Sequence, residues 1–79
     1  MRYVYILKSE SIDEAYYIGI TSDLKKRVKE HNYKNNKYTD KLQPWKLKCY
    51  FAFDEEKTAN AFEKYFKTSS GRAFCKKHF

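Results

Sequence analysis

Two short runs of β-branched and aromatic residues near the start of the chain constrain its fold. The runs are RYVYILK, residues 2–8, and AYYIGI, residues 15–20, and six mostly polar residues join them. Each run has the length of one strand, and a connection this short suits an antiparallel hairpin. Apolar residues on both faces of 2–8 predict an interior strand, and 15–20 has the same character. We therefore expect a sheet built around this hairpin.

The middle of the chain predicts one helix and one further strand. Thr21-Ser22-Asp23 offers N-cap side chains for a helix over LKKRVKEH, which ends near Asn32. The basic segment 33–44 has no clean period and is expected to be a long exposed loop. WKLKCYFAF, residues 45–53, alternates apolar residues with Lys, Tyr and Ala. This alternation predicts a third strand with one wetter face.

The last third of the chain predicts two helices. Acidic residues 54–56 favour the start of a helix that runs to about Lys67. Ser69-Ser70-Gly71 is expected to break it before a short terminal helix over 72–79. The predicted order β-β-α-β-α-α is typical of an α+β fold, a small three-stranded antiparallel sheet flanked by helices. A chain of 79 residues leaves room for a single domain, 1–79.

The charge balance narrows the class of partner. The chain has 17 Lys and Arg against 10 Asp and Glu, a net charge of +7, and a pI near 9.4. This excess favours a polyanionic partner, with simple solubility as the alternative. No apolar stretch approaches the ~20 residues of a membrane span, so no membrane partner is expected.

The cysteines and the N-terminus indicate the compartment. Cys49 and Cys75 lie far apart, with no CxxC and no His at ligand spacing. This argues against a structural zinc site and a disulfide framework. The N-terminal run lacks a signal-peptide cleavage site. We therefore expect reduced thiols and a cytoplasmic protein.

Three polar residues break the apolar stripes of the predicted helices. At about 100° per residue, Glu63 falls inside the stripe of the second helix, Arg27 at the edge of the first and His31 within it. A carboxylate there loses hydration unless a cation or donors replace the water. Such breaks tend to mark functional sites. The alternatives are a structural pair between Glu63 and Arg27 or a lysine, a snorkelling Arg27, and a His31 that only complements the helix dipole.

Placed in order, the unusual residues resemble the GIY-YIG nuclease superfamily. The similarity is greatest to small stand-alone bacterial members, related to the N-terminal domain of the excinuclease C protein. Three further stretches, TSDLKKRVKEHN, PWKL and AFEKYFKTSSGRAF, extend it over nearly the whole chain. Five ordered elements at family spacing make a specific signal. They are Tyr3-Val4-Tyr5, Tyr17-Ile18-Gly19, Arg27, His31-Asn32 and Glu63.

The resemblance implies a phosphodiesterase that uses a single divalent ion, Mg²⁺ or Mn²⁺. Glu63 would be the metal ligand, and Arg27 would contact the scissile phosphate. Tyr17 would be the general base or position the attacking water, and Tyr5 would support the orientation of the water or the phosphate from the adjacent strand. Because a tyrosine titrates near ~10, such a base needs positive charge nearby. His31 would assist proton transfer.

Two positions depart from the pattern of the GIY-YIG family. Tyr3 replaces the glycine of the family name, and Ile20 stands where several branches carry a basic residue or histidine. The second departure puts one phosphate or water contact in doubt. Gly19 is expected to let the phosphate backbone approach the strand end closely.

Basic and aromatic residues outside the motif are expected to bind substrate. Loop 33–44 is the candidate for binding a nucleic-acid strand, through base stacking on its tyrosines and phosphate contacts from its lysines. The alternative is a loop that is only solvated. The substrate-binding residues predicted besides Gly19 are Lys26, Lys34, Lys37, Tyr38 and Arg72.

The leading hypothesis from sequence is a metal-dependent endonuclease that acts on DNA, selecting structure or damage, in repair or recombination. The alternative is a non-catalytic basic nucleic-acid-binding module on the same fold. A third hypothesis is a protein whose basic surface binds RNA or a partner protein. Metal dependence separates the first from the others, and the oligomeric state is left open.

Overall fold

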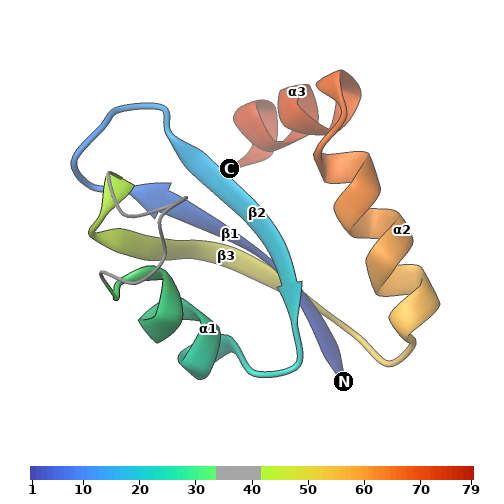
Figure 1. Cartoon of the computed structure of the whole chain (residues 1–79). Helices are drawn as coiled ribbons and strands as arrows, with labels where there is room; N and C mark the ends of the chain where they lie inside the picture. The colour runs from blue at the N-terminus through green and yellow to red at the C-terminus, as the bar shows by residue number, and fades with distance from the viewer. Residues whose placement is uncertain (34–41) are drawn as a thin grey trace.

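The N-terminal hairpin forms, and its first strand lies at the centre of the sheet. A computed structural model of the chain describes residues 1–33 and 42–79. Strand β1 (Arg2–Ser9) pairs antiparallel with β2 (Tyr16–Thr21) and with β3 (Trp45–Phe53), so the sheet order is β2-β1-β3 (Figure 1). The interior position of β1 is confirmed. β2 is an edge strand despite its similar composition, because a three-stranded sheet has one interior place.

Helices cover both faces of this sheet. α1 (Leu24–His31) packs on one face, and α2 (Glu56–Phe66) with α3 (Ser69–His78) packs on the other (Figure 1). The predicted α+β fold and the order β-β-α-β-α-α are confirmed. In the described part of the chain, no helix is long and apolar enough to cross a membrane.

Alternation along β1 produces a separate apolar cluster on each face. Val4 and Ile6 pack toward α2, where Ala59 and Phe66 are fully buried. Neighbouring β1 residues point the opposite way and form the cluster under α1, which consists of Tyr5, Leu7 and Trp45 with the partly buried Tyr17, Leu24, Val28, Leu42 and Leu47. Side chains of adjacent strand residues point to opposite faces, so one central strand supplies both clusters.

A β-bulge in β3 changes which face its apolar residues cover. Ile6 pairs with Cys49 while Leu7 pairs with Leu47, so Lys48 is the extra residue. One extra residue reverses the facing of everything beyond it. The apolar residues before Lys48 therefore join the α1-side cluster, and those after it join the α2-side cluster. The alternation predicted for 45–53 is present, but the single apolar face is wrong.

The predicted break at residues 69–71 is also wrong, because these residues form the first turn of α3. The chain turns one step earlier, at Thr68, which is the N-cap of α3. The Thr68 hydroxyl accepts from the Gly71 amide at 3.1 Å and donates to the Tyr65 carbonyl at 2.6 Å. A threonine in this position satisfies an otherwise unpaired helix amide.

The contact between α2 and α3 predicts a strict need for glycine at position 71. A methyl group on Gly71 would collide with the Tyr65 carbonyl oxygen and lie 2.6 Å from Phe66 Cα, and backbone atoms cannot move aside cheaply. We expect Gly71→Ala to lower the free energy of unfolding by about 2 kcal/mol, measured by urea denaturation. Ser70→Ala, exposed in the same turn, is the control. Equal stability of the two variants would contradict this tight contact.

Candidate active site

Tyr5 lies at the centre of the candidate site. It is 1% exposed, in the middle of the central strand and on the α1 side of the sheet. Its hydroxyl oxygen is 3.0 Å from Nε2 of His31, the last residue of α1. Its ring stacks on Tyr17 of β2 with centroids 6.2 Å apart, and the Tyr17 and His31 rings are 4.4 Å apart. Three of the predicted catalytic residues therefore form one aromatic cluster.

Gly19 makes room for this cluster. It is the direct cross-strand partner of Tyr5. A methyl group there would collide with the Tyr5 hydroxyl and lie 2.6 Å from Tyr5 Cζ and 3.0 Å from Tyr17 Cε1. The space expected for a phosphate backbone is thus filled by a side chain of the chain itself. The glycine of the YIG triplet is needed here because the Tyr5 ring crosses it.

The end of α1 is fixed to the rest of the molecule by residues that the sequence reasoning missed. The Asn32 side chain donates to the Trp45 carbonyl at 3.1 Å and accepts from the Trp45 amide at 2.6 Å. The Gln43 amide nitrogen donates to the carbonyls of His31 and Tyr33, each at 2.7 Å. In the sequence motif, Asn32 is only the neighbour of His31. An Asn after a helix is a common ending, so its bonds to β3 had no signal in the pattern.

Burial sets the protonation of His31. Burial lowers its pKa below the ordinary value, the positive charge of Arg27 lowers it further, and the negative charge of Glu30 opposes this. His31 is therefore a neutral imidazole near pH 7 and can accept a hydrogen bond. Its helix-dipole role, the alternative taken from sequence, requires the charged form and is disfavoured by this burial.

Tyr5 is held in its neutral form. Burial raises its pKa, Tyr17, Glu63 and Glu30 raise it further, and Arg27 lowers it. The Tyr5 hydroxyl can therefore donate to the neutral His31 and is unsuited to act as a base.

Arg27 lies at the rim of the cluster with its charged end in water. Its side chain is 44% exposed, and Nη1 is 3.8 Å from Glu30 Oε1. A loose, exposed pair of this kind contributes less than about 1 kcal/mol and does not hold the guanidinium in place. Its charge nevertheless influences both Tyr5 and His31. Arg27 is thus close to the buried cluster and available to an anion.

Glu63 is mostly buried in α2 and has a partner. Its side chain is 19% exposed, and Oε2 is 3.4 Å from Nζ of Lys67, one helical turn later. The stripe position is therefore satisfied in part by a lysine, the structural alternative considered from sequence. The partner could have been found, since Glu–Lys pairs at i,i+4 are favoured on helices. The charge of Glu63 also contributes to the raised pKa of Tyr5.

Glu63 is a candidate metal ligand without a surrounding set of protein ligands among the described residues. Among the described residues, no group of three or more His, Cys, Asp or Glu side chains converges on one point. A protein cage for a metal is therefore not formed by these residues. Mg²⁺ is often bound by one or two carboxylates together with waters and phosphate oxygens. A single, mostly buried carboxylate near Tyr5 meets that requirement.

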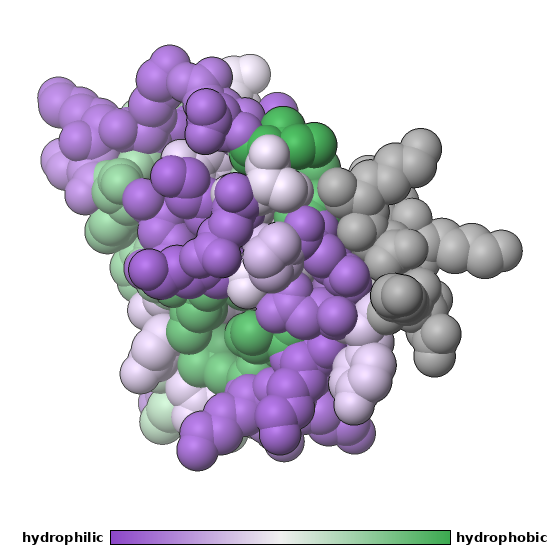
Figure 2. All heavy atoms as spheres, turned by 90° about the vertical axis from the view of Figure 1, so that its left-hand side faces the viewer, coloured by the Kyte–Doolittle hydropathy of each residue, from purple (hydrophilic) through white to green (hydrophobic). Residues whose placement is uncertain are grey.

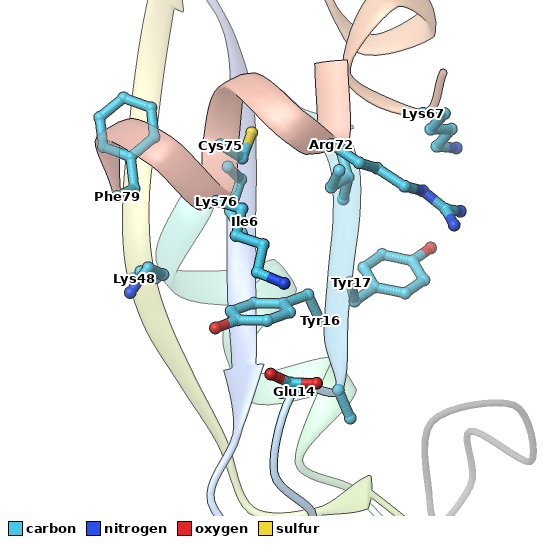
Figure 3. A pocket seen from close by; sticks show the side chains of 12 residues that line it. Ile6, Glu14, Tyr16, Tyr17, Lys48, Lys67, Arg72, Cys75, Lys76 and Phe79 are labelled. Carbon is cyan, nitrogen blue, oxygen red and sulfur yellow. The ribbon is translucent and has the colours of Figure 1, made fainter. Parts of the chain in front are cut away.

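The predicted substrate-binding residues that the structure describes lie on different elements. Lys26 is exposed on α1. Arg72 on α3 lines a groove of about 730 Å³ together with Tyr17 and Lys67 (Figure 3). Lys34, Lys37 and Tyr38 lie outside the described residues, as does most of loop 33–44. The side of the molecule that carries α1 and the β1–β2 turn is mostly hydrophilic with small apolar patches (Figure 2).

The lowered pKa of His31 predicts a pH-dependent stability. The unfolded chain binds this proton near the ordinary pKa of ~6.5, and the folded chain binds it only at lower pH. We expect the contribution of His31 to the free energy of unfolding to be at its maximum above about pH 7 and to fall as the pH drops below ~6.5. Urea denaturation across this range should show the decline reduced in His31→Gln and kept in His78→Gln, the exposed second histidine. An unchanged decline in His31→Gln would contradict the assignment.

Comparison with known proteins identifies the family to which the chain belongs. The model of the GIY-YIG catalytic domain matches residues 1–77. A UPF0213 protein of Streptococcus pyogenes serotype M3 is 40% identical over 72 residues, covering 90% of this chain and 76% of the relative. A UPF0213 protein of Clostridium perfringens is 43% identical over 68 residues, covering 85% and 71%. No solved structure gives a significant match. The chain therefore belongs to the GIY-YIG nuclease family, with these small bacterial proteins as relatives.

Proposed function

We propose that the protein is a divalent-metal-dependent endonuclease that hydrolyses phosphodiester bonds in DNA, selecting branched, distorted or damaged DNA during repair or recombination. The observation that carries the proposal is the aromatic cluster of Tyr5, Tyr17 and His31, with the charges of Arg27 and Glu63 close enough to shift the pKa of Tyr5. Family membership supports nuclease chemistry. The net charge of +7 supports a nucleic-acid substrate.

The side chains divide the chemistry between them. Arg27, exposed at the rim, binds the scissile phosphate and stabilises the charge that develops on it. Tyr17 is partly exposed, so its hydroxyl can reach a water molecule that the buried Tyr5 cannot. Tyr17 orients this attacking water or takes its proton. The rings of Tyr5 and His31 both pack on the Tyr17 ring and limit its movement.

The metal would be held by Glu63. Bound there, Mg²⁺ or Mn²⁺ would supply Lewis-acid stabilisation of the phosphate and the leaving oxygen. The Lys67 ammonium pairs with this carboxylate, with Nζ 3.4 Å from Glu63 Oε2, but the lysine side chain is 53% exposed. The lysine can therefore leave for water at little cost. Glu63 would then hold the metal in place of the lysine without a large rearrangement of α2.

A second candidate function is a basic nucleic-acid-binding module on the same fold. The observation that favours it is the pair between Glu63 and Lys67, because a carboxylate already neutralised by a lysine needs no metal. Ile20, where several branches of the family carry a basic residue or histidine, points the same way. Such a module would bind DNA through its lysines and arginines and leave it intact.

The first prediction from this proposal concerns Glu63. Wild type should cut a branched DNA duplex in the presence of Mg²⁺ or Mn²⁺, and EDTA should abolish cutting. Glu63→Gln keeps the size of the side chain and removes its charge, so cleavage should fall by about 10²-fold or more. Gel assays of a branched duplex, a plain duplex and an RNA hairpin would measure the rates. Glu10→Gln, an exposed carboxylate elsewhere, is the control and should cut normally.

Each result of this assay separates the two candidates. Metal-dependent cleavage that is lost in Glu63→Gln alone supports the endonuclease and its ligand together. DNA binding without cleavage in wild type, equal in Glu63→Gln, would favour the binding module. A strongly destabilised Glu63→Gln, seen by urea denaturation, would instead identify the Glu63–Lys67 pair as structural.

The second prediction concerns the Tyr17 hydroxyl. Tyr17→Phe keeps the ring that packs on Tyr5 and His31 and removes only the group assigned to the water. The cleavage rate should drop by about 10²-fold, the size of a general acid–base contribution, while DNA affinity stays within about twofold. Tyr16→Phe removes the neighbouring, exposed hydroxyl and serves as the control. Normal cleavage by Tyr17→Phe would reduce Tyr17 to a packing residue.

A further inference from the structure

A groove between β2 and α3 adjoins the aromatic cluster at Tyr17 and has two kinds of wall. Its volume is about 730 Å³, within the range of ~300–1,000 Å³ typical of ligand pockets. Figure 3 shows α3 above the groove and the side chain of Lys76 reaching toward the Tyr16 ring of β2. The apolar wall consists of Ile6, Ala15, Ile18, Cys75 and Phe79.

The other wall is cationic. Four basic side chains line the groove, and they are Lys48, Lys67, Arg72 and Lys76. Glu14 is the carboxylate facing them among the described lining residues. In the part of the chain that the structure describes, Lys67 alone of the four forms an ion pair. The groove therefore has an excess of positive charge that its own residues leave uncompensated, and it suits an anion.

The combination of walls specifies the kind of anion. Tyr16 is 47% exposed, and Lys48 Nζ lies 5.9 Å from the centroid of its ring. A paired duplex presents mainly phosphates and sugars to a surface and would leave this ring and the apolar wall without contacts. An unpaired nucleotide presents a phosphate to the cations and a flat base to the ring and the apolar wall. Stacking and a cationic groove are the usual means of binding single strands.

The groove is continuous with the candidate active site. Tyr17 lines it and also packs in the aromatic cluster with Tyr5 and His31. Lys67 lines it and also pairs with Glu63. A strand whose scissile phosphate lies at Arg27 and Glu63 would therefore pass directly into the groove.

We propose that the groove between β2 and α3 binds an unpaired nucleotide of the strand being cut, next to the scissile phosphate. The proposal rests on the proposed nuclease function and deepens it by naming the substrate class, a DNA junction or flap with a single-stranded segment. Arg72, Lys76 and Lys48 contact the phosphates, and Tyr16 stacks on the base. Selection of structure then arises from the groove, because a fully paired strand would leave the Tyr16 ring and the apolar wall without contacts.

Binding measured without metal tests the groove independently of cleavage. The probes are a short fluorescein-labelled oligothymidylate and a labelled plain duplex, followed by anisotropy in EDTA. The groove variant is Lys48→Gln/Arg72→Gln/Lys76→Gln. The control variant, Lys25→Gln/Lys57→Gln/Lys77→Gln, removes the same charge from exposed residues outside the groove.

The charge variants should differ in affinity. We expect the groove variant to lose oligothymidylate affinity by about tenfold or more and its salt slope to shrink by about 2, since three phosphate contacts are removed. The control variant should lose less than about threefold. Equal losses of oligothymidylate affinity in the two variants would show that binding depends only on the total charge. That result would overturn the proposal that the groove is the binding site.

Tyr16 tests the base contact. Tyr16→Ala should weaken oligothymidylate binding by about fivefold or more while duplex binding stays unchanged, and Tyr16→Phe, which keeps the ring, should restore it. Equal effects on oligothymidylate and duplex would overturn stacking. Thymidine monophosphate that competes as strongly as the oligonucleotide would overturn the strand and indicate a free-nucleotide site.

The failure of this proposal and the failure of the nuclease function are distinguishable. Glu63→Gln should lose cleavage and bind oligothymidylate at least as tightly as wild type, because Glu63 does not line the groove and the loss of its charge frees Lys67, which does. A wild type that cleaves branched DNA while both triple variants bind alike keeps the nuclease and loses the groove. A wild type that never cleaves, yet loses single-strand binding only in the groove variant, keeps the groove and loses the nuclease.

Discussion

The hydrogen bond between the Tyr5 hydroxyl and His31 Nε2 joins the central strand to the end of α1, and the candidate site is built on it. It joins a neutral imidazole and a protonated phenol, the forms that burial favours, and either group can be the donor. It also requires a place for the Tyr5 ring over β2, which only a glycine at position 19 provides. The two motif triplets are therefore one structural unit, because the tyrosine of the first occupies the space that the glycine of the second leaves open.

This unit depends in turn on how the sheet distributes its side chains. β1 places Tyr5 and Leu7 toward α1, and Val4 and Ile6 toward α2, so one strand anchors both the site and the opposite core. The bulge at Lys48 lets β3 follow the same division, with its first half under α1 and its second half under α2. The extra residue also leaves Lys48 exposed beside Tyr16, on the side of the groove. A local irregularity of β3 thus contributes to a cationic surface.

Much of the fold was predictable from sequence because its signals are local. Strand composition, the N-cap at Asp23 and the helix stripe set the order of elements, and the fold class follows from that order. Two predictions were wrong, the single apolar face of strand 45–53 and the helix break at residues 69–71. Both features depend on contacts between different elements, which local sequence patterns do not show. The bulge at Lys48 exists because β3 must pair with β1 and cover both faces, and Thr68 caps α3 only because that helix begins against Tyr65. In the site, the helical spacing of about 100° per residue identified Glu63 as a polar residue within an apolar stripe. The same spacing could not show that the Asn32 side chain forms hydrogen bonds with β3.

The position of Lys67 connects the two halves of the proposed mechanism. Its ammonium lies on the Glu63 carboxylate and its side chain lines the groove, so it borders the metal ligand and the strand path together. A carboxylate in an apolar stripe needs a counter-charge in the free protein, and a half-exposed lysine supplies one without a fixed cage. If Glu63 held a metal, as we propose, the Lys67 ammonium would remain beside the groove, where the phosphate of an entering strand would pair with it. Charge would then be paired at both places, and Glu63 would have a counter-charge both before and after substrate binds.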